Sequence, residues 1–187
     1  MASDVPGPIL PRLFESSDGH AEWLPPRGQD VGLLLRDTTL AALVRHSGRP
    51  YVVAVDSDSV EGLADDESGI HFLVAELGFR IVLTRHAEVA GRLADAGALA
   101  LMRVLALDSS GLERSLESHP RRPGVGTVLS PGLVLPHLPA AVRATLPRPL
   151  VAYGLLNEPG DVAACLSLAD SVVVRRELLA ALRNAPR

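Results

Sequence analysis

The sequence contains no lysine, and all 18 of its lysine-plus-arginine residues are arginine. This absence excludes chemistry that depends on a lysine amine, including Schiff bases, lysine general bases and phosphate-binding P-loops. Cysteine is almost absent too, because Cys165 is the only one among 187 residues. A lone cysteine forms no internal disulfide and no multi-cysteine zinc site, which favours a reducing compartment.

Aromatic residues and long apolar runs are also scarce. The chain has one Trp, two Tyr and three Phe, so few rings are available to stack on nucleic-acid bases. No run approaches the ~20 apolar residues that a membrane-spanning helix needs. The first residues lack the basic and apolar regions of a signal peptide. We therefore expect a cytoplasmic protein with no membrane partner.

The net charge of −4 is unevenly distributed along the chain. Residues 1–118 contain ten arginines and 18 acidic residues, a net of −8. Residues 119–187 contain eight arginines and four acidic residues, a net of +4. An acidic protein is a poor general binder of nucleic acid, but a basic C-terminal third still allows one local patch.

Short apolar runs rich in β-branched residues alternate along the chain with segments of helical period. The runs are nearly unbroken, which is typical of strands buried on both faces of a parallel sheet. A chain of this length favours one domain. We expect strands at 8–10, 31–35, 51–55, 80–83, 99–105, 126–129, 150–153 and 171–174.

The intervening segments predict helices at 14–24, 38–46, 66–77, 86–96, 109–117, 138–146, 159–168 and 176–183, with Asp37 as the N-cap of the second. Eight strands alternating with eight helices predict an α/β chain, residues 1–187, folded as a compact single-domain (β/α)8 barrel like a TIM barrel. A doubly wound sheet is the alternative. The chain has no Gly-x-Gly-x-x-Gly at a helix start, which disfavours a dinucleotide-binding fold.

Polar and small residues follow the expected strands at their C-terminal ends, where βα barrels bind ligands. Arg85 and Arg103 are suited to grip a phosphate or carboxylate through paired hydrogen bonds. We expect the strand ends to converge on one pocket. The alternative is that these residues cap helices and form ion pairs at the rim. The ligand-binding candidates are Asp56, Asp58, Arg85, Arg103, Ser130, Gly132, Gly154 and Arg175.

No catalytic or metal-binding arrangement is recognisable in the sequence. The segment Asp56-Ser57-Asp58 after an apolar strand resembles the nucleophile motif of haloacid-dehalogenase phosphatases, but that chemistry usually also needs a lysine. The six histidines lack metal-ligand spacing, and there is no Gly-x-Ser-x-Gly elbow. Cys165 lies among apolar residues, where packing is expected. We therefore expect no catalytic residue, no metal and no cofactor.

Five blocks carry a resemblance to a known family. They are Asp-Ser-Val-Glu-Gly-Leu at 58–63, Thr-Arg at 84–85, Arg-Val-Leu-Ala-Leu-Asp-Ser-Ser at 103–110, Ser-Pro-Gly at 130–132 and Gly-Leu-Leu at 154–156. Through these blocks the chain resembles the glycerol-3-phosphate responsive antiterminator family. The resemblance implies a barrel-like βα fold in a bacterial cytoplasmic regulator of glycerol metabolism. Such a regulator binds glycerol-3-phosphate and acts on leader mRNA to prevent early termination.

The resemblance thus implies two partners, a small anion such as glycerol-3-phosphate and a leader mRNA. RNA contact is then expected from arginines of the basic C-terminal third. Two alternatives stay open: a small-molecule-binding barrel without RNA function, and a barrel enzyme acting on a phosphorylated metabolite. The RNA-binding candidates are Arg121, Arg122, Arg143 and Arg148.

The departures from the family pattern fall mainly at its expected phosphate cradle. Tyr153 replaces the first of two family glycines, Asp170 lies where the family has a small turn, and Arg175 ends the last strand in place of serine. Asp56 replaces a family histidine. A backbone cradle needs small residues so that N–H groups reach the phosphate. We therefore expect weak or absent glycerol-3-phosphate binding unless Arg175 supplies the missing interaction.

Overall fold

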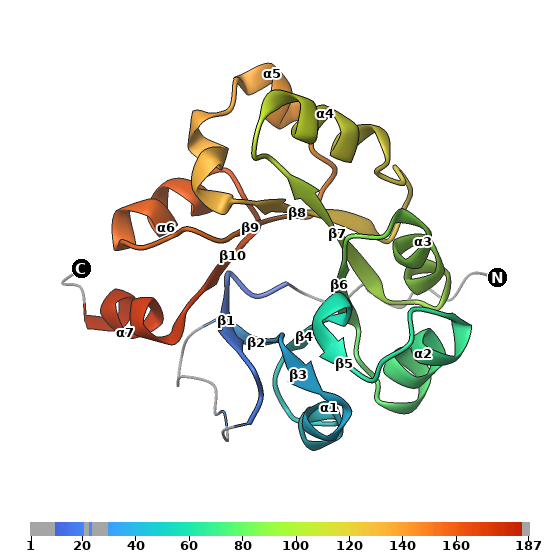
Figure 1. Cartoon of the computed structure of the whole chain (residues 1–187). Coiled ribbons are helices and arrows are strands. Elements are labelled where there is room, and N and C mark those ends of the chain that lie inside the picture. Colours follow the sequence, from blue (N-terminus) through green and yellow to red (C-terminus); the bar gives the residue numbers. More distant parts are fainter. Residues whose placement is uncertain (1–9, 21–22, 24–29, 185–187) are drawn as a thin grey trace.

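Eight parallel strands close into a barrel, which confirms the fold expected from the sequence (Figure 1). The computed structural model describes residues 10–20, 23 and 30–184. The first strand pairs with both the second and the last, and this pairing closes the ring. Around the barrel the strands are β1 (Leu13–Ser17), β10 (Ser171–Val174), β9 (Leu150–Tyr153), β8 (Val125–Ser130), β7 (Leu99–Leu105), β6 (Ile81–Thr84), β4 (Val53–Asp56) and β2 (Val31–Leu35).

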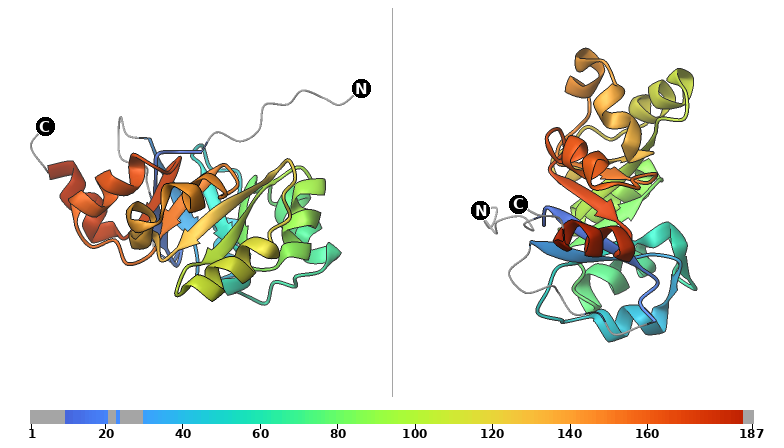
Figure 2. Two further views of the ribbon diagram at one scale, coloured as in Figure 1. Left: turned by 90° about the horizontal axis from the view of Figure 1, so that it is seen from above. Right: turned by 90° about the vertical axis from the view of Figure 1, so that its left-hand side faces the viewer.

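Helices surround the strands on the outside of the barrel (Figure 2). Two short strands, β3 (Thr38–Thr39) and β5 (Val60–Glu61), pair with each other outside it. None of the helices in the described ranges is long and apolar enough to cross a membrane. The helices are α1 (Leu40–His46), α2 (Glu67–His71) with the π-helical η2 (Phe72–Glu76), α3 (Ala87–Asp95), α4 (Ser109–Glu117), α5 (Ala140–Ala144), α6 (Pro159–Leu166) and α7 (Arg176–Asn184), with 3-10 turns η1 (Ser57–Ser59) and η3 (Gly132–His137).

The first strand is the main difference from the sequence prediction. The helix expected over 14–24 is wrong at its start, because Leu13–Ser17 is β1. The strand expected at 8–10 lies almost entirely outside the described residues. Phe14 explains the outcome: its ring is 1% exposed inside the barrel, and Gly32 on β2 leaves space for it. A β-carbon at Gly32 would lie 2.8 Å from that ring.

The N-terminus of α1 also differs from the prediction. Asp37 is not its N-cap; the Thr39 side chain accepts a hydrogen bond from the Ala42 N–H instead. Asp37 has a φ of 48°, and its own N–H donates to Ser59 in η1. The β3–β5 pair therefore displaces the start of α1 by two residues from the position that the local pattern indicates.

Two apolar layers explain why the strand sequences are nearly unbroken. One layer fills the barrel interior, and the other lies between the strands and the helices. Neighbouring residues of a strand point to opposite faces, so Leu34 enters the interior while Leu33 and Leu35 pack under the helices. The interior residues are Phe14, Leu34, Ala54, Ile81, Leu83, Leu99, Leu101, Val128, Val151 and Val173.

Candidate functional site

The side chains at the C-terminal mouth follow from the alternation of the strands. Interior residues fill the middle of the barrel, and the residue two positions later lies at the C-terminal end of the strand or directly after it. Each strand thus contributes one residue to a ring at the C-terminal end of the barrel. The ring consists of Ser16, Arg36, Asp56, Arg85, Arg103, Ser130, Tyr153 and Arg175.

Asp56 and Arg103 form a buried ion pair across the mouth. The Arg103 Nη2 lies 2.6 Å from the Asp56 Oδ2, and the Asp56 side chain is only 3% exposed. Burial raises the pKa of Asp56, because its effect outweighs the attraction of Arg103. The Asp56 Oδ1 and the Arg103 Nε have no hydrogen-bond partner among the described residues. The pair therefore has capacity for further polar contacts.

Tyr153 lies between two guanidinium groups and covers the apolar interior. The Arg36 and Arg103 guanidinium carbons lie 5.6 and 5.5 Å from its ring centroid, within cation–π distance. Arg36 also donates a hydrogen bond to the Tyr153 hydroxyl and pairs with Asp37 at 2.7 Å. Burial raises the pKa of Tyr153, so its hydroxyl stays protonated at neutral pH. The two arginines and the tyrosine close the centre of the mouth.

A hollow of about 290 Å³ opens beside Tyr153, between β1, β2, β9 and β10. It contains two arginines, Arg36 and Arg175, together with Ser16 and Asn157, and none of the described residues that line it carries a carboxylate. Arg175 is exposed and donates to the Asn157 Oδ1 at 3.1 Å. Positive charge with hydroxyl and amide groups suits a small anion.

Backbone strain marks the edge of this hollow. Gly154 has a φ of 94°, and Leu155 has a φ of 59° although it carries a side chain. A leucine in the left-handed region costs on the order of 1 kcal/mol. The Leu155 side chain is also 63% exposed, so burial does not compensate for that cost. Strain that packing does not explain is a feature of ligand-binding loops.

The predicted ligand residues are divided between two hollows at this end of the barrel. Gly154 and Arg175 line the hollow described above. Asp58 and Arg85 line another of about 280 Å³, between η1 and α3. Asp58 is fixed there, because its carboxylate accepts from the Thr84 hydroxyl at 2.8 Å and the Arg85 N–H at 2.7 Å.

The other predicted ligand residues have structural contacts. Asp56 and Arg103 pair with each other at the centre of the mouth. Ser130 faces the Gly154 backbone, since a β-carbon on that glycine would lie 3.7 Å from the Ser130 Oγ. Gly132 allows η3 to approach β9, because a β-carbon there would lie 2.6 Å from the Tyr153 nitrogen.

Sequence reasoning missed Arg36 and Ser16 as hollow-lining residues. Arg36 follows the apolar run of β2 directly and was available to the same strand-end argument. Ser16 was not recoverable in that way, because its segment was expected to be a helix. Only the position of β1 in the barrel brings Ser16 to the mouth.

Three of the four arginines predicted to bind RNA already have partners. Arg122 pairs with Asp95, and Arg148 pairs with Asp170 at 2.9 Å. Arg143 donates to the Leu138 carbonyl oxygen. Arg121 is exposed and has no hydrogen bond or ion pair within the described part of the chain. Carboxylates therefore neutralise two of these four arginines, Arg122 and Arg148, whereas the carbonyl contact of Arg143 leaves its charge intact.

The described residues offer neither a metal-binding cluster nor an accessible cysteine nucleophile. The described residues contain no group of three or more His, Cys, Asp or Glu side chains placed to hold a metal ion. Cys165 is fully buried in α6, and burial raises the pKa of its thiol. The Cys165 side chain is part of the hydrophobic core, as its apolar sequence context predicted.

Comparisons with known proteins agree with the fold and identify the family. The family model for the glycerol-3-phosphate responsive antiterminator matches residues 37–177. Curated protein sequences gave no match.

Two crystal structures share the architecture. One is a glycerol uptake operon antiterminator regulatory protein from Listeria monocytogenes, 16% identical over 92% of this chain and 94% of that chain, with a TM-score of 0.71. The other is a glycerol uptake operon antiterminator-related protein from Thermotoga maritima, 23% identical over 91% and 98%, with a TM-score of 0.72. At these identities the structures support the fold, whereas the family model covers most of the sequence itself. This chain belongs to the glycerol-3-phosphate responsive antiterminator family.

Proposed function

We propose that this chain is a regulator of transcript termination that responds to a small phosphorylated polyol and acts on leader RNA. Glycerol-3-phosphate is the first ligand to test, because the family is named for its response to that molecule. Action on a nascent leader RNA requires the protein to be in the cytoplasm. We also propose that it regulates and does not catalyse.

One observation carries the ligand part of the proposal. The described lining of the hollow beside Gly154 includes two arginines and no carboxylate, at the barrel end where TIM-like barrels bind phosphate. Arg175 is the better anchor, because its described contact is the neutral Asn157 side chain. Arg36 is partly neutralised by Asp37. The start of α7 at Arg176 adds the positive end of a helix dipole next to Arg175.

From the same geometry we expect the affinity for the anion to depend strongly on Arg175. The family resemblance implies a glycine at the position of Tyr153, so fewer backbone N–H groups should be open to an anion in this chain. A charge-assisted hydrogen bond contributes about 1.5–3 kcal/mol. Loss of that contact should weaken binding roughly 10-fold to 100-fold.

Isothermal titration calorimetry with glycerol-3-phosphate, glycerol and inorganic phosphate tests this proposal. We expect heat of binding for glycerol-3-phosphate and a 10-fold to 100-fold loss in Arg175→Gln. The matched control is Arg85→Gln, which removes an exposed arginine from the neighbouring hollow. That control should bind like the unmodified chain.

Two results would contradict the ligand assignment. Loss of binding in Arg85→Gln with none in Arg175→Gln would place the phosphate beside Asp58 instead. Absence of binding for all three compounds would refute control by this ligand class, and the barrel would then lack the proposed response.

A further inference from the structure

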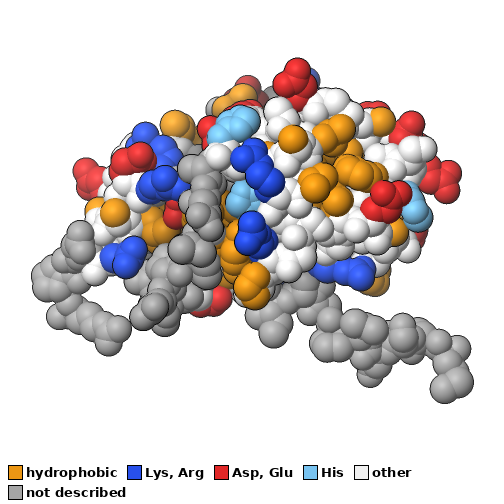
Figure 3. Space-filling model, turned by 90° about the horizontal axis from the view of Figure 1, so that it is seen from below, with side chains coloured by type: hydrophobic (Ala, Val, Ile, Leu, Met, Phe, Trp, Pro, Cys, Tyr) orange, Lys and Arg blue, Asp and Glu red, His pale blue; other side chains and the backbone are white. Residues whose placement is uncertain are grey.

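A groove at α1, far in sequence from the basic C-terminal third, brings three arginines together. It consists of two adjoining hollows of about 390 and 150 Å³, which share His46, Arg49 and Tyr51. Arg80 lines the larger hollow and Arg45 the smaller one. We call these five residues the α1 groove. Figure 3 shows the face over α1, where arginine and histidine side chains gather near the middle and most carboxylates lie toward the edges.

Among the described residues, no acidic partner neutralises the charge of the α1 groove. Arg45 donates to the His20 carbonyl oxygen at 3.5 Å, and Arg49 donates to the Arg45 carbonyl oxygen at 3.1 Å. Arg80 has no ion pair among the described residues. No carboxylate is among the described residues that line either hollow. Burial lowers the pKa of His46, so the positive charge at neutral pH comes from the three arginines.

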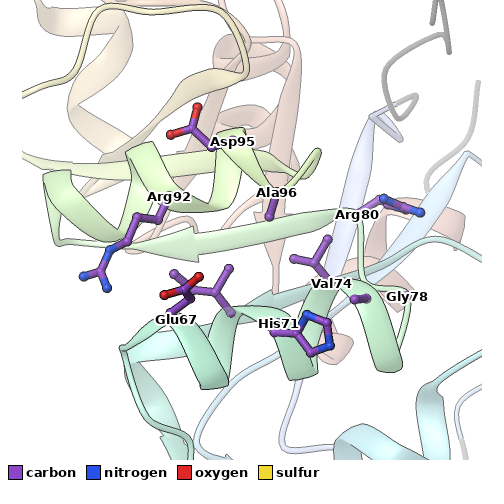
Figure 4. A pocket seen from close by; sticks show the side chains of 10 residues that line it. Glu67, His71, Val74, Gly78, Arg80, Arg92, Asp95 and Ala96 are labelled. Atoms are coloured by element: carbon purple, nitrogen blue, oxygen red, sulfur yellow. The ribbon is translucent and has the colours of Figure 1, made fainter.

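A larger hollow next to the α1 groove differs from it in charge. It measures about 740 Å³ and lies between α2 and α3, where carboxylates of Glu67 and Asp95 accompany the arginines (Figure 4). Arg80 lines both this hollow and the 390 Å³ hollow of the α1 groove. In Figure 4 its guanidinium group extends away from both carboxylates. The α2–α3 hollow is therefore mixed in charge, whereas the α1 groove is not.

Aromatic side chains form part of the wall of the α1 groove. Three of the six aromatic residues, Trp23, Tyr51 and Phe79, line its hollows. The Trp23 and Tyr51 rings meet edge to face, with centroids 4.8 Å apart at 65°. Trp23 is 3% exposed, and its indole N–H finds no acceptor among the described residues. Trp23 and Phe79, each 3% exposed, support the wall from behind, and Tyr51 is the aromatic residue of the groove that is partly exposed.

We propose that the α1 groove binds single-stranded RNA, an inference that rests on the proposed action on leader RNA. Three uncompensated arginines complement a phosphate backbone. The partly exposed Tyr51 ring offers one aromatic contact to a base that is unstacked from its neighbours, and RNA bases and phosphates supply acceptors for the arginine donors. A duplex hides its bases from such hollows. The groove, not the C-terminal arginines, is then the main RNA surface.

Fluorescence anisotropy with a short labelled oligouridylate tests the inference on the full chain. We expect Arg45→Gln combined with Arg49→Gln to weaken binding at least 10-fold. Loss of two phosphate contacts should also reduce the salt slope by about 1.4, at ~0.7 per contact for single strands. Both arginines are exposed, so the variant should remain folded. A self-complementary duplex of the same length should bind more weakly than the single strand.

The matched control is Arg121→Gln combined with Arg122→Gln, which removes the same charge from the C-terminal third. It should bind RNA within about 2-fold of the unmodified chain. Unchanged glycerol-3-phosphate titration in the groove variant would show that its barrel mouth is intact.

The outcomes separate this inference from the proposed function. If the unmodified chain binds RNA but only the Arg121/Arg122 variant loses affinity, the α1 groove assignment is overturned while action on RNA stands. Equal binding of duplex and single strand overturns the single-strand assignment. If the unmodified chain binds neither the single strand nor the duplex, action on leader RNA itself is refuted.

Discussion

Replacing Arg103 with methionine should lower the stability of the fold, because Asp56 would stay buried without its ion-pair partner. In the native barrel the two side chains are 2.6 Å apart, and Asp56 is 3% exposed. Methionine preserves much of the side-chain volume but removes the charge, leaving a buried carboxylate without its close partner. Breaking a buried ion pair in this way costs about 3–5 kcal/mol. For a chain of this size that loss lowers the melting temperature by roughly 6–20 °C.

The pH dependence of this variant follows from the direction of the Asp56 pKa shift. Burial already raises the pKa of Asp56, and removal of Arg103 should raise it further. The folded state then holds a proton that the unfolded state has released, so stability falls as pH rises above the ordinary aspartate range. The deficit of Arg103→Met should therefore be largest near neutral pH and shrink toward about pH 4.

Urea unfolding followed by circular dichroism at several pH values measures this deficit. The double variant Arg103→Met with Asp56→Asn removes the titrating group, so its deficit should be smaller at neutral pH and nearly independent of pH. A loss below about 1 kcal/mol in Arg103→Met would refute the reasoning. A deficit that is constant with pH, and equal in the single and double variants, would refute it as well.

Two further predictions concern packing. Gly132→Ala should destabilise the fold by about 1–3 kcal/mol in urea unfolding, because its β-carbon would lie 2.6 Å from the Tyr153 backbone nitrogen. In the control Gly160→Ala the new β-carbon has no atom within 4 Å, so the substitution should be neutral or stabilising by about 0.4–1 kcal/mol. Equal losses of stability in the two variants would contradict the close approach at Gly132. Cys165 should resist a thiol reagent in the native protein and react fully in denaturant, because it is buried and its thiol pKa is raised; rapid native labelling would show that α6 opens.

Much of the barrel was predictable because the signal is local. Seven of its strands coincide with apolar runs, and their burial on both faces explains why those runs lack alternation. Helices α3 and α4 begin and end within a residue of their predicted limits, since caps and turns at their ends are set by neighbouring residues. The first strand was not predictable in this way. Phe14 lies in β1 because its ring fits against Gly32 of another strand.

The mouth was predictable only in part. The strand-end argument brings Asp56, Arg103 and Arg175 to one end of the barrel, because parallel strands share their direction. It does not tell which side chains neutralise each other. The pairing of Arg103 with Asp56, and the separation of Asp58 from Arg175 into different hollows, depend on contacts between strands that are distant in the chain.

The charges of the arginines show most clearly what the sequence determines and what the tertiary structure decides. The sequence by itself determined an alternating βα barrel, the absence of lysine and disulfide chemistry, and an excess of arginine in the last third of the chain. Only the tertiary structure decided which arginines keep their charge free. It pairs Arg122 and Arg148 with carboxylates. It also brings Arg49 and Arg80 together in one hollow, although both belong to the part of the sequence with a net negative charge. The physical reason is that a local potential depends on distances in space, which a count along the chain does not contain.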